Sequence, residues 1–196
     1  MKERKKKRKL KLSKTARSLV TITDAKSAIS EQFRTIRTNI TFSMPDQELK
    51  TILVTSSTPG EGKSTTAANI GVVFAQEGKR VLIVDADMRK PTLHHTFKLF
   101  NNSGLSNVLA RKNLFSEVIQ ETFLVGLHII TSGPIPPNPA ELLSSKMMDA
   151  FMVEIQQHYD LIIFDAPPLL SVSDAQILSN KCEGTLLIVN SGEVEK

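Results

Sequence analysis

The 196-residue sequence predicts an α/β protein in which helices flank a mostly parallel central sheet. Two runs of four apolar residues, 81–84 and 161–164, each end at an aspartate, and continuous apolar runs are typical of parallel strands buried on both faces. A third, largely β-branched run at 51–54 leads through a glycine-containing turn into a helical segment. The length suits one domain with a real core, and the single cysteine, Cys182, excludes an internal disulfide and suits a reducing cytoplasm.

The positive charge of the sequence is concentrated at its N-terminus. Residues 1–17 contain ten Lys or Arg residues and one acid, whereas the remaining 15 basic and 19 acidic residues give the rest of the chain a net charge of −4. We therefore predict a basic, flexible arm over 1–25 and a folded domain over 26–196. No apolar core follows the basic residues, so the arm is not a secretory signal, and no window approaches the ~20 apolar residues that cross a bilayer.

Three interpretations of this arm compete: a solvated tail, a contact with nucleic acid, and attraction to an anionic membrane surface. The arm has no aromatic residues that could stack on bases, so nucleic acid is an unlikely partner by composition. Charge alone favours the solvated tail.

The first helix is predicted over 27–42 from apolar residues at helical spacing. The apolar face consists of Ile29, Phe33, Ile36 and Ile40. Glu31, Arg34 and Arg37 fall to one side of that face, and their spacing alone indicates a solvated flank with a weak Glu–Arg pair.

The segment 55–65, T-S-S-T-P-G-E-G-K-S-T, has the sequence of a P-loop. It follows the strand at 51–54 and opens a helix that should run to about Gln76, with Gly78 placed to end it. Ser57 stands where the first glycine usually lies, which a small residue should tolerate. An ordinary strand–turn–helix corner is the alternative, and the surrounding pattern disfavours it.

The chemistry of a P-loop explains these residue types. Gly60 and Gly62 allow the backbone N–H groups to face phosphate oxygens at the positive end of a helix. Lys63 would reach the β- and γ-phosphates, and the Ser64 hydroxyl would ligate Mg²⁺. The sequence therefore predicts binding of a nucleoside triphosphate with its Mg²⁺. The predicted nucleotide contacts are Thr58, Pro59, Gly60, Glu61, Gly62, Lys63, Ser64 and Thr65.

Aspartates follow two of the predicted buried strands. The strand at 80–88 contains Asp85 and Asp87 at its end, and the next such strand ends at Asp165 in the Walker B arrangement. In a parallel sheet the ligand site lies beyond the carboxyl ends of the strands, beside the phosphates. A single acid at this place is commonly a helix cap, but two acids around one alanine favour a metal site. The predicted Mg²⁺ ligands are Ser64, Asp85, Asp87 and Asp165.

The remaining segments predict supporting elements. Short helices are expected at 104–109 and 114–119, strands at 127–130 and 184–190, and one helix from Asn138 to about His158. The inward face of that long helix would be Leu142, Leu143, Met147, Phe151 and Ile155. The chain ends six residues after the last strand, so the fold is expected to be short at its C-terminus.

Five segments together resemble the bacterial P-loop tyrosine kinases of the polysaccharide co-polymerase system, over about residues 30–190. They are E-Q-F-R-T-I-R-T-N at 31–39, P-G-E-G-K-S-T at 59–65, V-D-A-D-M-R-K-P at 84–91, S-G-P-I-P-P-N-P-A-E-L-L at 132–143 and I-I-F-D-A-P-P at 162–168.

The resemblance implies an ATP-dependent protein-tyrosine kinase that regulates capsular and exopolysaccharide synthesis. Its catalytic residues would be Lys63, Asp85, Asp87 and Asp165. The resemblance leaves open which of Asp85 and Asp87 activates the tyrosine hydroxyl. It also places Glu31, Arg34 and Arg37 at the subunit contacts of a homo-oligomeric ring.

Relatives of this kind work in the cytoplasm with a membrane-anchored activator, whose tail completes the nucleotide site. The substrates would be protein tyrosines, and the basic arm would suit the anionic inner face of the membrane.

Two departures from the family leave alternatives open. The chain has one tyrosine, Tyr159, instead of a tyrosine-rich tail, and the final strands and helices of the family are missing. One alternative is a partitioning or septum-positioning ATPase, but such proteins have a second lysine where this chain has Thr58. The other is a non-catalytic nucleotide-binding subunit.

Overall fold

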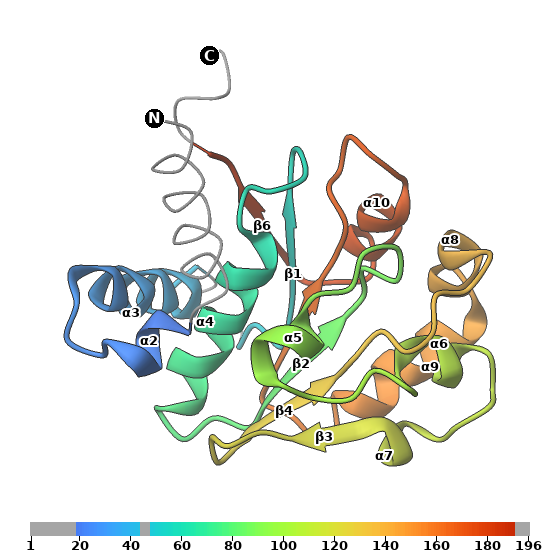
Figure 1. Cartoon of the computed structure of the whole chain (residues 1–196), viewed down its shortest axis with the longest axis horizontal. Coiled ribbons are helices and arrows are strands. Elements are labelled where there is room, and N and C mark those ends of the chain that lie inside the picture. Colours follow the sequence, from blue (N-terminus) through green and yellow to red (C-terminus); the bar gives the residue numbers. More distant parts are fainter. Residues whose placement is uncertain (1–18, 44–47, 191–196) are drawn as a thin grey trace, which may run out of the picture.

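The computed structural model describes residues 19–43 and 48–190. In this part of the chain, helices pack on both faces of a six-stranded sheet (Figure 1). The strand order is β3-β4-β2-β5-β1-β6, in which β3 is antiparallel to β4 and every other pair is parallel. The strands are β1 Thr51–Ser56, β2 Val81–Asp85, β3 Ile119–Glu121, β4 Leu127–Ile130, β5 Leu161–Asp165 and β6 Gly184–Ile188. The predicted α/β class with a mostly parallel sheet is confirmed.

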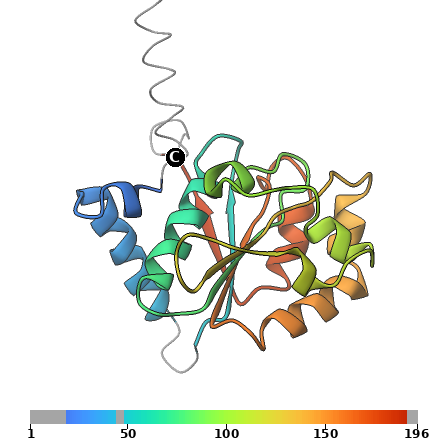
Figure 2. The ribbon, with the colours of Figure 1, turned by 60° about the horizontal axis from the view of Figure 1, so that its bottom comes forward.

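The helices form two layers, because neighbouring residues of each central strand point to opposite faces. Leu82 and Val84 of β2 join one core cluster, and Val81 and Ile83 join the other. The second cluster lies under α2 (Val20–Thr23), α3 (Ala28–Thr41), α4 (Lys63–Ala75) and α5 (Leu93–Phe97). The first lies under α6 (Leu105–Leu109), α7 (Phe115–Val118), α8 (Pro139–Leu143), α9 (Lys146–Ile155) and α10 (Asp174–Ser179). Figure 2 shows α3 and α4 on one side of the sheet and α9 and α10 on the other.

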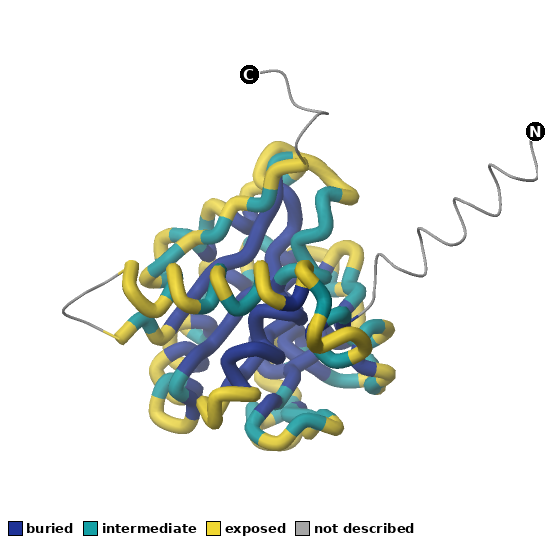
Figure 3. Tube along the Cα trace, turned by 90° about the vertical axis from the view of Figure 1, so that its left-hand side faces the viewer, coloured by how far each residue is buried: buried dark blue, intermediate teal, exposed yellow. Residues whose placement is uncertain are grey.

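The central strands are buried along their whole length, as their apolar runs predict (Figure 3). Their register brings the polar residues at their ends together: Asp85 of β2 pairs with Asp165 of β5, and Asp165 pairs with Val54 of β1. The sheet therefore delivers the P-loop and both strand-end aspartates to one edge.

The helix predicted from Asn138 to about His158 is two helices, α8 and α9. Ser145 interrupts it, because its hydroxyl accepts a hydrogen bond from Met148 N–H and caps α9. Leu143, Phe151 and Ile155 are buried as expected. The buried face also includes Met148 and Met152, whereas Leu142 and Met147 are only partly buried.

Four further elements were not anticipated by the sequence patterns. They are the short strand β3 and the helices α2, α5 and α10. The other predicted elements are confirmed, although β2 is shorter than the strand predicted at 80–88 and β6 ends at Ile188. On α3, Ile29 is 54% exposed, so only the later members of its predicted apolar face pack against the core.

The segment just before α3 packs against α4. Leu19 and Thr21 are buried, and both the backbone N–H and the hydroxyl of Thr21 donate hydrogen bonds to Oδ1 of Asn69. Part of the segment 1–25 that composition assigned to a basic arm is therefore structured, whereas residues 1–18 lie outside the described residues. Within 19–43 and 48–190, no helix combines the length and apolar character that crossing a bilayer requires.

Candidate nucleotide and phosphoryl-transfer site

The loop between β1 and α4 has the backbone of a phosphate-binding loop. Gly60 and Gly62 have φ values of 93° and 91°, a left-handed conformation that glycine adopts without strain, and Gly62 is the N-cap of α4. Among the described non-glycine residues only Lys98 and Arg111 have positive φ, so Ser57 needs no glycine at the first position of the motif. The departure from the P-loop pattern is thereby accommodated.

The side chain of Glu61 fixes the outer part of this loop. Its Oε2 accepts a hydrogen bond from Thr58 N–H at 2.8 Å, and its Oε1 accepts one from Asn190 N–H at 3.2 Å, just beyond β6. The bond from Thr58 is the main cause that lowers the pKa of this exposed carboxyl. The structure shows Glu61 linking the loop to the end of β6, and its predicted contact with the nucleotide stays a prediction.

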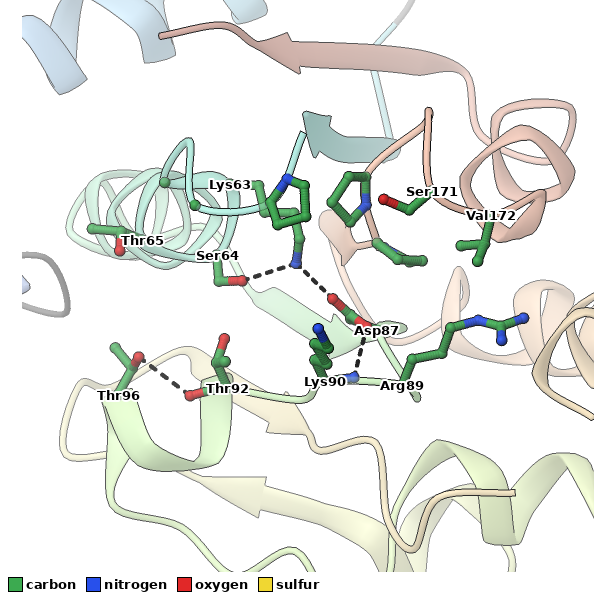
Figure 4. Close-up of a pocket in the computed structure, with 15 residues that line it drawn as sticks. Lys63, Ser64, Thr65, Asp87, Arg89, Lys90, Thr92, Thr96, Ser171 and Val172 are labelled. Atoms are coloured by element: carbon green, nitrogen blue, oxygen red, sulfur yellow. Dashed lines mark hydrogen bonds and ion pairs between the residues drawn. The ribbon is translucent and has the colours of Figure 1, made fainter. Parts of the chain in front are cut away.

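The side chain of Lys63 lies among the strand-end carboxylates. Its Nζ is 2.9 Å from Oδ2 of Asp87 and 3.2 Å from Oγ of Ser64 (Figure 4). The same atom is 3.5 Å from Oδ1 of Asp165. Burial is the largest effect on this amine and opposes its charge, yet the carboxylates of Asp165 and Asp87 together raise the pKa of Lys63. The structure therefore brings together four residues that sequence analysis placed at the site.

Asp85 lies deeper than Asp87. It is fully buried, and its Oδ2 accepts hydrogen bonds from the N–H groups of Thr92 and Leu93 at 3.2 and 3.1 Å. Burial, followed by the charge of Asp165, raises the pKa of Asp85 well above its usual value. Asp85 thus positions the start of α5 in addition to facing Asp165.

Burial also raises the pKa of Asp165, although Lys63 and a hydrogen bond from Ser64 act against it. One carboxylate oxygen on Asp85 and one on Asp165 are buried without a hydrogen-bond partner among residues 19–43 and 48–190. The three aspartates do not, by themselves, form a ready-made cluster of metal ligands in the described part of the chain. The orphaned carboxylate oxygens and the Ser64 hydroxyl are nevertheless the hard oxygen donors that Mg²⁺ prefers, so these residues fit the ion.

A pocket of about 450 Å³ opens beside these groups. Three segments line it: 59–65 of the P-loop, 87–96 after β2, and 167–172 after β5. Asp87 lines the pocket together with Lys63, whereas the fully buried Asp85 does not. Figure 4 shows the side chains of Lys63 and Asp87 pointing toward each other. Such a pocket can hold phosphate groups against α4 and leaves room for a second reactant.

Sequence patterns assigned no role to two residues near the pocket, Arg89 and Asp174. Arg89 makes a two-bonded ion pair with Asp174, the first residue of α10. The 85 positions between them explain why no local pattern revealed the pair.

The structure places Glu31, Arg34 and Arg37 on α3, away from the pocket. Arg34 pairs with Glu31 and donates to the carbonyl of Ala25. Arg37 pairs with Glu77 of the adjacent α4 segment and donates to the carbonyl of Val73 at 3.4 Å. All three therefore have partners within the chain, and a role at a subunit interface stays a prediction.

Comparison with known proteins identifies relatives that cover most of the chain. A family model described as an AAA domain matches residues 49–191. Tyrosine-protein kinase YwqD of Bacillus subtilis is 53% identical over 184 residues, which are 94% of this chain and 78% of that protein.

Solved structures of other proteins also match this chain. The chimerical protein CapA2B2 matches with a TM-score of 0.86 and 44% identity, covering 89% of this chain and 77% of that one. The kinase domain of Escherichia coli tyrosine kinase ETK matches with a TM-score of 0.87 and 34% identity, covering 90% and 69%. The septum site-determining protein MinD of Pyrococcus horikoshii, solved with Mg-ADP, has a TM-score of 0.61 and 24% identity over 72% and 58% of the two chains. That last likeness concerns the fold alone.

Proposed function

The chain belongs to the bacterial tyrosine-protein kinases of the P-loop fold, and from this we propose that its site transfers the γ-phosphoryl group of ATP to tyrosine hydroxyls of proteins. The proposal rests on the ion pairs of Lys63 with Asp87 and Asp165 at the N-terminus of α4. A cation for phosphate oxygens and a carboxylate for a proton line one pocket, and the buried carboxylates suited to a metal lie next to them.

The P-loop supplies the binding half of the reaction. The N–H groups around Gly60 and Gly62 and the positive end of α4 would hold the phosphates, and Lys63 would stabilise negative charge that develops on the γ-phosphoryl oxygens. Ser64, Asp85, Asp87 and Asp165 would hold Mg²⁺. When bound, Mg²⁺ neutralises charge on the phosphate oxygens.

Asp87 is the better placed of the two aspartates to accept the proton of the acceptor. It lines the pocket, whereas Asp85 is fully buried and holds the backbone of α5. As the tyrosine oxygen bonds to the γ-phosphorus, the bond from phosphorus to the bridging oxygen of ADP breaks, and the hydroxyl proton passes to the Asp87 carboxylate.

The cellular setting proposed for this activity rests on the family resemblance. It consists of control of capsular or exopolysaccharide synthesis, a membrane-anchored activator, and a homo-oligomer with contacts through Glu31, Arg34 and Arg37. The basic residues of 1–17 support an association with the anionic inner face of the membrane. Cytoplasmic location follows from the same proposal.

A partitioning or septum-positioning ATPase is the second candidate, and the fold shared with MinD is what it has in common with this chain. Those ATPases carry a second lysine early in the P-loop, at the position of Thr58 here. Thr58 has no cationic side chain to take that role, and its backbone N–H donates a hydrogen bond to the Glu61 carboxylate. A non-catalytic nucleotide-binding subunit is the third candidate.

Incubation with γ-labelled ATP, Mg²⁺ and a tyrosine-containing copolymer, with and without an activator-tail peptide, separates the three. The proposal expects label on tyrosine. Release of free phosphate without phosphotyrosine would favour the ATPase, and nucleotide binding without either product would favour the non-catalytic subunit.

A further inference from the structure

The ion pair between Arg89 and Asp174 joins two distant segments at the pocket. Arg89 Nε lies 2.9 Å from Oδ2 of Asp174, and Arg89 Nη2 lies 3.0 Å from Oδ1. The Asp174 side chain is 0% exposed and the Arg89 side chain is 40% exposed. A bidentate arginine–carboxylate pair fixes orientation as well as distance, and loss of either partner of a buried pair leaves an uncompensated polar group.

This pair fixes one end of the segment 167–173, which forms a wall of the pocket. Val172 lines the pocket only two residues before Asp174, and Arg89 lines it from the segment after β2. The other end of the wall is fixed to the P-loop strand, because Leu169 N–H donates to Ser56 O at 2.8 Å and Leu170 N–H donates to Ser57 O at 3.3 Å. The wall is thus held at both ends, once by the P-loop and once by Arg89.

The position of the wall suits the acceptor rather than the nucleotide phosphates. The phosphates belong at the start of α4, and an in-line reaction brings the acceptor oxygen to the γ-phosphorus from the side opposite ADP. Pro167 and Pro168 line the pocket beside the P-loop strand and Val172 lines it farther along the wall, so this segment offers an apolar surface. Figure 4 shows Ser171 and Val172 on the side of Lys63 that faces away from Thr65. An aromatic ring is favoured by such a surface, with its hydroxyl directed toward Asp87.

We propose that Arg89 and Asp174 are positioning residues, which hold the segment 167–173 as the surface on which the tyrosine ring of the acceptor rests. The inference rests on the proposed function and adds to it the place where the acceptor binds. It requires that a change in the ion pair alters acceptor binding and leaves nucleotide binding intact.

The decisive variant is Asp174→Asn, which keeps the side-chain volume and removes the charge. We expect the KM for a tyrosine peptide to rise about 10-fold or more, since small displacements of a bound reactant have effects of this size. We expect the Kd of a non-hydrolysable ATP analogue with Mg²⁺ to change less than about twofold, because the P-loop is untouched. Arg89→Lys should have a smaller effect than Arg89→Met, since lysine restores the charge without the two-bonded geometry.

A matched control lies at the opposite end of β2. Arg80 makes an equivalent two-bonded pair with Asp160, at 2.8 and 3.4 Å, outside the pocket. Asp160→Asn should therefore leave the KM for the acceptor unchanged. Thermal unfolding of each variant shows whether it folds, and Arg89→Lys replaces Asp174→Asn if the latter does not.

Peptide affinity measured directly by calorimetry, in the ATP analogue and Mg²⁺, separates this inference from the proposed function. Weaker peptide binding in Asp174→Asn and parental binding in Asp160→Asn would support the positioning role. Equal peptide binding in the parent and Asp174→Asn would overturn it. So would a parent that binds no peptide, or an Asp174→Asn variant that loses nucleotide affinity and keeps peptide affinity. A parent that binds peptide but makes no phosphotyrosine would overturn only the proposed function, because the affinity comparison still decides the role of the pair.

Discussion

The Nζ atom of Lys63 and the Oδ2 atom of Asp87 lie 2.9 Å apart, although 24 positions separate the two residues in the sequence. Both side chains are largely buried, at 13% and 6% exposure, so their attraction is only weakly screened by water. The lysine suited to phosphate and the aspartate suited to the acceptor proton thus form a single charged unit.

Asp85→Asn should stabilise the protein near neutral pH while it lowers phosphoryl transfer. The folded protein raises the pKa of Asp85, chiefly through burial, so the contribution of this carboxyl to stability is present below its unfolded pKa of about 4 and is lost as pH rises through the folded pKa. Asparagine avoids the buried charge and can still accept a hydrogen bond from the start of α5. Thermal unfolding without nucleotide or Mg²⁺ should show a gain at pH 7 that disappears toward pH 4.

Asp160→Asn provides a control of opposite sign. Hydrogen bonds from Arg80 lower the pKa of Asp160, so its stabilising contribution is present above the unfolded pKa and is lost as pH falls through the folded pKa. This variant should be less stable than the parent at pH 7 and should approach it at low pH. A loss of stability at pH 7 in Asp85→Asn would contradict the assignment of a costly buried charge.

The strand-end carboxylates should act as one unit in Mg²⁺-dependent turnover. We expect Asp87→Ala and Asp165→Ala each to reduce kcat strongly, and the double variant to lose far less than the product of the two effects, because both act on the same ion and the same lysine. Steady-state rates over a Mg²⁺ titration measure this. Independent, multiplicative losses would indicate that the two residues have separate roles.

The parts of the site that follow local patterns could be predicted from the sequence. A buried parallel strand, the turn around Gly60 and Gly62, and a helix start are specified by neighbouring residues, and the strand-end aspartates meet because the register aligns β2 with β5. These aspartates could be predicted as metal ligands without knowing the order of the strands in the sheet.

The remaining features depend on tertiary contacts or on competition between similar local structures. The Arg89–Asp174 pair and the Glu61–Asn190 bond join segments more than 80 residues apart, which no sequence window contains. The break before α9 was missed because the apolar spacing continues through Ser145, whose hydroxyl caps a new helix instead. Strand β3 has three residues and exists only through its pairing with β4.

Arg34 and Arg37 of α3 are the residues expected at a subunit interface, although both also form ion pairs within the chain. Arg34→Ala with Arg37→Ala should shift an oligomeric parent toward monomer in light scattering. Because Arg37 also pairs with Glu77, the double variant should lose a small amount of stability, within the ~0–1 kcal/mol of a surface pair.

Glu77→Ala is the matched control for this change, since it removes the same pair within the chain and leaves both arginines. It should keep the parental mass. If the arginine variant also keeps the mass of an oligomeric parent, these residues form only the solvated flank of α3.

Tyr159 should not be phosphorylated efficiently in the folded protein. It is 6% exposed, its hydroxyl lies 2.8 Å from Nδ1 of His128, and β5 begins two residues later. Delivery of this hydroxyl to a neighbouring site would require local unfolding of a buried strand, a large fraction of the ~5–15 kcal/mol that stabilises a typical domain. Mass spectrometry after incubation with ATP and Mg²⁺ checks this directly, and substantial phosphate on Tyr159 of folded protein would show that the strand opens.

The most direct test of the proposed centre is the rate of phosphotyrosine formation by Lys63→Met, measured on a tyrosine copolymer with saturating ATP and Mg²⁺. Methionine keeps most of the side-chain length and removes the cation that lies between Asp87 and Asp165. We predict a rate lower by about 10²-fold or more with an unchanged circular dichroism spectrum, because the loss is of transition-state stabilisation and not of the fold. A folded Lys63→Met protein that retained most of the parental rate would contradict the assignment of this pocket as the phosphoryl-transfer centre.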